Sequence, residues 1–257
     1  MDLGLKGKVA IVTGGGRGIG KGCSTVLAQE GCSLAIADLA HDEDTRAYMD
    51  GLVKQYGVDV LELNADVSDE NQIDMIFQAA LEHFGRVDIL INNAGRGAIR
   101  KPFHQLTTED WRSVQEITLN SQFFMSRKFV KYCRDNERPG SIVNVLSKSA
   151  FTTNSKDNTT YISAKMGAYG LTKGVANEMA PYGIRVNGIV PGYVQTERTY
   201  PDGDARTERM RALLPTGKFT LPIEIGRVAA FLCSDCSSQI IGAAIDLSLI
   251  HISEPTR

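Results

Sequence analysis

Residues 8–20, KVAIVTGGGRGIG, contain the pattern that decides the fold: an apolar strand, a glycine-rich turn and the start of a helix. The apolar run 9–12 has no polar alternation, which predicts a strand covered on both faces. The turn lets the backbone bend sharply and approach a bound group at Gly14, Gly16, Gly18 and Gly20. Because this turn opens a helix, its N–H groups and the positive helix end predict a pyrophosphate site.

The rest of the chain repeats this alternation of short β-rich runs and longer stretches of helical period. Such an alternation indicates βαβ units laid into a parallel sheet. We predict strands at 8–13, 33–38, 59–64, 87–92, 141–147, 185–190 and 243–246. The expected fold is α/β: one Rossmann-type domain over residues 1–246, a doubly wound parallel sheet of about seven strands with helices on both faces.

One long segment, residues 195–220, lacks a clean strand and is rich in charged residues. An excursion of this length after a strand's carboxyl end is expected to cover the ligand crevice of a doubly wound fold. We therefore predict that it forms the substrate loop and contains a short helix.

Composition excludes several classes of function. The formal net charge of −2 comes without a block of Lys and Arg, so neither nucleic acid nor a membrane surface is an expected partner. The longest apolar runs fall far short of the roughly 20 residues of a membrane span, and no signal-peptide pattern opens the chain. The expected location is the cytoplasm. Five scattered cysteines indicate free thiols, and Cys233-x-x-Cys236 without a second pair predicts no metal site.

Asp38 closes the second predicted strand, eighteen positions after Gly20. A carboxylate there can accept hydrogen bonds from an adenosine ribose and repel a 2′-phosphate, which favours NAD(H) over NADP(H). Arg17 in the glycine loop could reach a 2′-phosphate, yet Leu39 and Ala40 supply no second cation. The alternative for Asp38 is an ordinary turn residue before a helix.

Tyr161 and Lys165 stand four residues apart, which on a helix places them on one face. A protonated lysine, together with an oxidised nicotinamide, would lower the pKa of the phenol from about 10 toward working pH. Tyr161 then acts as a base in oxidation and as an acid in reduction. Tyr169 and Lys173 repeat the spacing about 12 Å further along the helix. They are expected to be packing residues, because Tyr161 lies nearer the strand ends.

With these residues the chain resembles the short-chain dehydrogenase/reductase family over about residues 5 to 246. The motifs that carry the likeness are the 13–20 loop, Asp66-Val67, Asn92-Asn93-Ala94-Gly95, Asn120, Ser147, Tyr161 with Lys165, and Pro191-Gly192 followed by Thr196. The resemblance implies an active enzyme that moves a hydride between NAD(H) and a secondary alcohol or ketone.

The resemblance also implies a role for each matching position. Tyr161 would exchange the proton, Ser147 would hydrogen-bond the substrate oxygen, and Asn120 would hold a water that links Lys165 to solvent. Ser149 shares the strand face of Ser147 and remains the alternative to it. The implied cofactor contacts are Gly14, Gly16, Arg17, Gly18, Ile19, Gly20, Asp38, Asp66, Val67, Asn93, Ala94, Gly95, Tyr161, Lys165, Pro191, Gly192, Val194 and Thr196.

The expected substrate is a small alcohol or carbonyl compound. Basic residues gather in the predicted substrate loops, where they would favour a phosphate or carboxylate or would simply be solvated: Arg96, Arg100, Lys101, Lys148, Lys156, Arg198, Arg206, Arg209 and Arg211. The residues Ser147-Lys148-Ser149, Ser155-Lys156 and Asn158 are similar to a loop of sugar-alcohol-phosphate dehydrogenases. A polyol or polyol phosphate is therefore the first expectation. A 3-oxoacyl thioester is the alternative, and a dinucleotide-binding regulator is the non-enzymatic one.

The last eleven residues, 247–257, do not resemble the ends of relatives. They read like the in-frame translation of a sequencing adapter, so we expect a tail that is not native. In relatives this end lies at a subunit interface, so the tail would alter one interface of a homotetramer. A homodimer through the helices of Asn120 and Tyr161 would be less affected.

Overall fold

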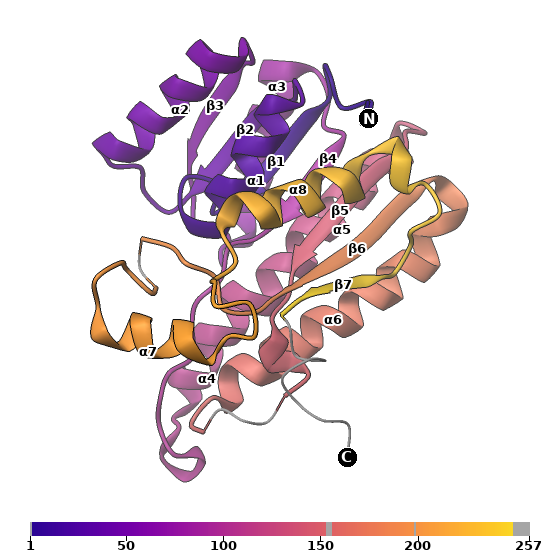
Figure 1. Ribbon diagram of the computed structural model, residues 1–257. Coiled ribbons are helices and arrows are strands. Elements are labelled where there is room, and N and C mark those ends of the chain that lie inside the picture. The colour runs from indigo at the N-terminus through magenta and orange to yellow at the C-terminus, as the bar shows by residue number, and fades with distance from the viewer. Residues whose placement is uncertain (1, 153–155, 198, 249–257) are drawn as a thin grey trace.

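A computed structural model describes residues 2–152, 156–197 and 199–248. Within them, seven parallel strands form one sheet in the order β3-β2-β1-β4-β5-β6-β7 (Figure 1). The strands are β1 Val9–Thr13, β2 Ser33–Asp38, β3 Val60–Asn64, β4 Ile89–Asn92, β5 Gly140–Val145, β6 Ile184–Pro191 and β7 Ala244–Leu247. The predicted fold class is confirmed, because strand order reverses between β1 and β4 as in a doubly wound sheet.

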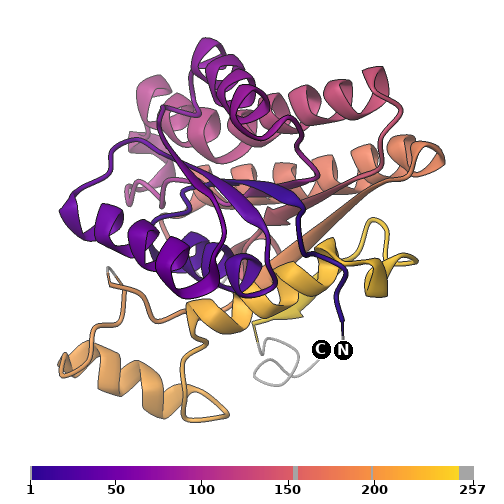
Figure 2. The same cartoon turned by 90° about the horizontal axis from the view of Figure 1, so that it is seen from above.

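Helices cover both faces of this sheet (Figure 2). The α-helices are α1 Gly18–Gln29, α2 Glu43–Tyr56, α3 Glu70–Phe84, α4 Thr108–Gln115, α5 Ser121–Asp135, α6 Thr159–Met179, α7 Ala205–Leu213 and α8 Pro222–Cys233. The short elements are η1 Phe103–Gln105, the π-helical turn η2 Glu116–Asn120, η3 Lys148–Ala150, η4 Ala180–Tyr182 and η5 Asp235–Ser237. Among the described residues, no helix is both long and apolar enough to cross a membrane.

The two faces of the sheet carry two separate cores because strand side chains alternate between them. On β1, Ala10 and Val12 pack with α1 and α8, whereas Ile11 packs with α3 and α5. All five residues of the strand are buried. The unbroken apolar runs read from the sequence are therefore explained by burial on both faces.

Helices α1 and α8 approach each other so closely that glycine is required where they cross. A Cβ at Gly226 would lie 2.2 Å from the Gly22 carbonyl oxygen, and a Cβ at Gly22 would lie 2.1 Å from the Pro222 carbonyl oxygen. Helix α1 begins at the glycine loop, and α8 follows the 195–220 segment. The contact between the two helices therefore sets the distance between the glycine loop and the 195–220 segment.

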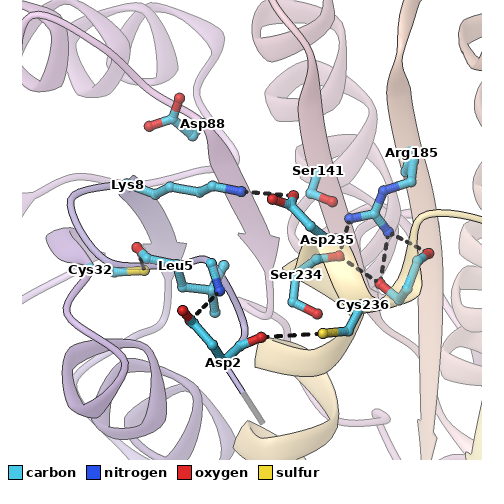
Figure 3. Close-up of polar contacts among 12 residues, drawn as sticks. Asp2, Leu5, Lys8, Cys32, Asp88, Ser141, Arg185, Ser234, Asp235 and Cys236 are labelled. Atoms are coloured by element: carbon cyan, nitrogen blue, oxygen red, sulfur yellow. Dashed lines mark hydrogen bonds and ion pairs between the residues drawn. The ribbon is translucent and has the colours of Figure 1, made fainter.

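The amino-terminal edge of the sheet is closed by polar contacts (Figure 3). The Arg185 guanidinium donates to the carbonyl oxygens of Leu232 at 2.7 Å and Ser234 at 3.0 Å, satisfying the last turn of α8. Lys8 and Asp235 point toward each other and pair at 3.1 Å. The sheet is thus tied to α8 and the residues after it at the edge opposite the predicted ligand crevice.

Several details differ from the sequence-based expectations. The fifth strand ends at Val145, so Ser147 does not close it but caps η3 instead, because its hydroxyl accepts the Ser149 N–H at 3.2 Å. Asn120 lies in the π-helical turn rather than in a regular helix. The last strand runs one residue further, to Leu247, and the expected non-native tail lies outside the described residues from position 249 onward.

Substitution of Gly226 by alanine tests the helix crossing. We expect Gly226→Ala to lower the free energy of unfolding by about 1–3 kcal/mol, because the new methyl group forces the backbones of α1 and α8 apart. The control is Gly51→Ala on α2, where a Cβ meets nothing within 4 Å. That change should raise stability by about 0.5–1 kcal/mol. Chemical denaturation monitored by circular dichroism measures both, and equal effects would contradict the packing argument.

Candidate active site

A cavity of about 1500 Å³ opens at the carboxyl edge of the sheet. Residues at the ends of β1, β2, β4, β5 and β6 line it, as does the 195–220 segment with α7, drawn in orange in Figure 1. Parallel strands place all their carboxyl ends on one edge, and the reversal of strand order between β1 and β4 opens the crevice there. Within the described residues, the predicted cofactor-binding positions all line this cavity except Gly20.

The glycine loop forms one end of the cavity. Gly14 has a φ of +65°, and a Cβ at Gly20 would lie 1.9 Å from the Gly14 carbonyl oxygen. Gly20 therefore serves the close packing of α1 against its own turn rather than the cavity wall. The N–H of Gly18 donates to Glu197 Oε2 at 3.2 Å, and the Glu197 carboxylate also lies 3.9 Å from Lys21 Nζ. The start of α1 thus already holds an anionic group, as expected of a helix N-terminus.

Asp38 lies at the end of β2, where its Oδ2 accepts the Gly16 N–H at 2.8 Å. Burial raises the pKa of this carboxyl above its ordinary value, while the Gly16 hydrogen bond and the nearby His41 and Arg17 oppose the shift. Arg17 lines the cavity, but its guanidinium pairs with Asp42. The basic side chain that could have met a 2′-phosphate is therefore engaged by a neighbouring carboxylate.

Asn93 ties β4 to β1 where the strand order reverses. Its side-chain amide donates to the carbonyl oxygens of Thr13 and Gly14, both at 3.0 Å. The Thr13 hydroxyl in turn accepts the N–H groups of Asn93 and Ala94, both at 3.0 Å. Asn92 points into the core, where it donates to Ser126 and Asn144. Of the Asn92–Gly95 motif, Asn92 serves the sheet and the other three residues form the cavity wall.

Tyr161, Lys165 and Ser147 meet at the other end of the cavity. Lys165 is buried on α6 and donates from Nζ to the Val145 carbonyl oxygen at 2.6 Å. Its Nζ lies 5.8 Å from the centre of the Tyr161 ring. Ser147 lies close enough to Tyr161 for its hydroxyl to lower the pKa of the phenol. A phenol, an alcohol and an ammonium thus converge on one point of the cavity wall.

Burial controls both titrating groups of this cluster. It lowers the pKa of Lys165 to about 8, because the charged ammonium loses its hydration. It raises the pKa of Tyr161, and the hydrogen bond from Ser147 acts in the opposite direction. The expectation was that Lys165 and an oxidised nicotinamide together lower the pKa of Tyr161. Within the protein itself burial is the larger of the two effects on Tyr161, so the pKa of its phenol lies above the ordinary value.

The alternative candidates are separated by their surroundings. Ser149 also lines the cavity, but Ser147 is the serine that lowers the pKa of Tyr161. Tyr169 does not line the cavity and packs against Phe151, with ring centres 5.1 Å apart. Its partner Lys173 lies 5.8 Å from the ring, the same distance as in the other pair, so spacing alone did not distinguish them.

Asn120 does not line the cavity, and its side-chain amide donates to Glu116 Oε2 at 2.8 Å. It occupies the end of the π-helical turn between α4 and α5. Such turns often mark functional positions, because the extra residue redirects a side chain. Its predicted role as a water holder remains a prediction.

Several contacts of the cavity were not predicted from the sequence. Lys148, one of the basic residues named above, lies with its Nζ 3.1 Å from the centre of the Tyr193 ring. Tyr200 packs edge-on against Tyr193, and Glu197 accepts the Gly18 N–H. No linear motif predicts these contacts, because Lys148 and Gly18 are distant in sequence from Tyr193 and Glu197, and Tyr193 and Tyr200 have no regular spacing. Of the basic residues proposed for this region, Arg198 lies outside the described residues.

Comparison with known proteins agrees with this geometry. A family model described as enoyl-(acyl carrier protein) reductase matches residues 14–248. The 3-oxoacyl-(acyl-carrier-protein) reductase of Thermotoga maritima is 35% identical over 95% of this chain and 97% of its own. The D-threitol dehydrogenase of Mycolicibacterium smegmatis is 35% identical over 94% of this chain and 92% of its own.

A solved structure shows the same architecture. The 3-ketoacyl-(acyl-carrier-protein) reductase of Brucella melitensis, complexed with NADH, superimposes with a TM-score of 0.82 at 30% identity, covering 95% of this chain and 98% of that one. The fold and the site define a nicotinamide-dinucleotide-dependent oxidoreductase acting on CH–OH groups. The chain belongs to the short-chain dehydrogenase/reductase family.

Removing the Tyr161 hydroxyl tests the proton-transfer site. We expect Tyr161→Phe to lower kcat by a factor of at least about 100, because proton transfer loses its donor. NADH affinity, measured by cofactor fluorescence, should stay nearly unchanged. The matched control is Tyr169→Phe, which keeps the ring that packs on Phe151. Full activity of Tyr161→Phe in a steady-state assay would contradict the assignment.

Proposed function

We propose that the protein is an NAD(H)-dependent dehydrogenase of a secondary alcohol, in which Tyr161 exchanges the proton and Lys165 and Ser147 assist it. The observation that carries this proposal is the convergence of these three side chains at one end of a cavity that has the glycine loop and Asp38 at the other. Bound nicotinamide dinucleotide would supply or accept the hydride.

The protein's own groups perform the remaining chemistry. Ser147 donates a hydrogen bond to the substrate oxygen and stabilises charge that develops there during reduction. Tyr161 gives its proton to that oxygen, and in the oxidation direction it takes the proton back. Lys165 places an amine beside the phenol and would hold the ribose of a bound nicotinamide. Asn120 supports a water between Lys165 and solvent.

Asp38 supports a preference for NAD(H). Its carboxylate lines the cavity beside the glycine loop. There it would accept hydrogen bonds from the ribose hydroxyl groups of the adenosine and repel the 2′-phosphate of NADP(H). The pairing of Arg17 with Asp42 leaves this region with a surplus of negative charge. The relative of known structure that binds NADH is consistent with this choice.

We propose a polyol or a polyol phosphate as the substrate. Charge is divided along the cavity: Asp38, Asp42, Asp44 and Asp66 lie at the adenosine end, whereas Arg96, Arg100 and Lys148 line the end near Ser147. A cationic wall of this kind suits an anionic or hydroxyl-rich substrate. The threitol dehydrogenase among the relatives acts on a polyol by its name.

A 3-oxoacyl thioester is the second candidate. The reductases of Thermotoga maritima and Brucella melitensis carry this activity in their names. Met210, Leu213 and Leu214 of the 195–220 segment line the same cavity and offer an apolar surface for an acyl chain. The two candidates are separated by supplying secondary alcohols, polyols, polyol phosphates and 3-oxoacyl thioesters with each cofactor and following its absorbance. Turnover of the thioester alone would contradict the polyol proposal.

We further propose that the enzyme works in the cytoplasm as a homodimer or homotetramer. The five cysteines are free thiols, which supports a reducing compartment. Large apolar side chains remain partly exposed on neighbouring helices, including Trp111 on α4 at 41% and Phe123 on α5 at 42%. A second copy of the chain would cover them.

Neutralising Asp38 tests the cofactor preference. We expect Asp38→Asn to lower kcat/KM with NAD⁺ roughly tenfold or more, because a charge-assisted hydrogen bond to the ribose is lost. The ratio of NADP⁺ to NAD⁺ activity should rise, because the repulsion of the 2′-phosphate disappears. Asp50→Asn, an exposed position on α2, is the control for a change of one charge. An unchanged cofactor ratio in Asp38→Asn would contradict the proposal.

Replacing Lys148 by methionine tests the cationic end of the cavity. We expect Lys148→Met to raise the KM of a polyol phosphate roughly tenfold while kcat changes little, because the lost ammonium contacts the phosphate away from the reacting carbon. The KM of the corresponding unphosphorylated polyol should change far less. Lys54→Met on α2, outside the cavity lining, is the control. Equal effects on both substrates would show that Lys148 does not recognise a phosphate.

A further inference from the structure

A carboxylate from the 195–220 segment lies at the start of helix α1. The N–H of Gly18, the first residue of the helix, donates to Glu197 Oε2 at 3.2 Å. The other oxygen of this carboxylate, Oε1, lies 3.9 Å from Nζ of Lys21, one turn further along α1. All three residues line the cavity. An acidic side chain is therefore seated in the cavity on a hydrogen-bond donor and beside a cation.

Helix α1 does not supply this anionic group itself. Arg17 at its N-cap makes no side-chain capping hydrogen bond, and its first turn contains no acidic residue. The first N–H groups of a helix have no partner within the helix and carry the positive end of its dipole. Glu197, 179 positions away along the chain, provides the missing negative charge.

The turn that carries Glu197 is anchored independently of α1. Thr196 and Thr199 exchange backbone hydrogen bonds of 3.0 and 3.2 Å, and their hydroxyl oxygens lie 2.8 Å apart. At the base of the segment, the Gln195 N–H donates to the Thr220 carbonyl oxygen at 3.0 Å. The Glu197 side chain is 58% exposed. It can therefore leave the helix start for water while the base of the segment stays in place.

Lys21 is held at the same place by other contacts. Its Nζ lies 4.8 Å from the centre of the Tyr48 ring, and the Tyr48 hydroxyl donates to the Lys21 carbonyl oxygen at 2.9 Å. In the part of the chain that the structure describes, Glu197 is its ion-pair partner. An anion that displaced Glu197 would thus meet both the ammonium of Lys21 and the N–H of Gly18.

We propose that Glu197 is a built-in competitor for the pyrophosphate of the cofactor, and that Lys21 and the Gly18 N–H form the site for which the two compete. This rests on the proposed function, which places a dinucleotide at the glycine loop. Two anions repel each other and cannot share one N–H donor, so Glu197 must leave before a phosphate oxygen takes its place. The cofactor therefore binds more weakly than the same site would bind it without the acid.

The experiment compares ADP with adenosine by titration calorimetry on the full-length chain. The dissociation constant of adenosine divided by that of ADP measures the contribution of the phosphate groups. Glu197→Gln should raise this ratio about threefold to tenfold, because a neutral amide competes less well for the Gly18 N–H and for Lys21. Lys21→Met keeps an unbranched side chain beside Tyr48 and should lower the ratio by a similar factor. The affinity for adenosine should stay unchanged in both variants.

Glu208→Gln is the matched control, because it makes the same change in the same segment outside the cavity lining. It should keep the wild-type ratio. An unchanged or lower ratio in Glu197→Gln overturns the proposal, and so does an unchanged ratio in Lys21→Met. If Lys21→Met does not fold, Glu197→Gln decides alone. Failure of ADP to bind the wild type contradicts the proposed function instead.

Discussion

The side-chain amide of Asn93 holds together the two halves of the sheet at the point where the active site forms. Its hydrogen bonds to the Thr13 and Gly14 carbonyl oxygens join the end of β4 to the glycine turn after β1. The backbone ladder between β1 and β4 ends at Val12 and Ile91, before the two loops. Beyond that point the Asn93 side chain joins the loops, which fixes the shape of the cavity between them.

Close backbone contacts also connect the glycine loop to the 195–220 segment. Gly20 brings α1 against its own turn, and Gly22 and Gly226 bring α1 against α8. Helix α8 follows directly on the 195–220 segment, whose base is joined to Val194 through Thr220. The glycine turn and the 195–220 segment, both of which line the cavity, are therefore linked through a crossing of two helix backbones. In this arrangement Glu197 reaches the Gly18 N–H.

Electrostatics divides the cavity into regions with different tasks. Carboxylates line the end of the cavity beside Asp38, and cations line the end near Ser147, where Lys165 is buried against the Val145 carbonyl oxygen. Burial lowers the pKa of Lys165 to about 8 and raises the pKa of Tyr161, so it moves the two pKa values apart.

Much of the fold was determined by the sequence itself, since alternating apolar runs and helical periods are local properties. All seven predicted strands are present within a few residues of their expected limits, because burial on both faces leaves a continuous apolar signature. The glycine loop, Asp38 and the pair Tyr161 and Lys165 were also readable, since glycine and ionisable residues at fixed offsets from strand ends have few other uses. Tertiary structure shows that Tyr161 and not Tyr169 lines the cavity, as the nearness of Tyr161 to the strand ends predicted. It alone placed Glu197 at the Gly18 N–H and Lys148 over Tyr193, because these contacts join segments that have no regular spacing along the chain.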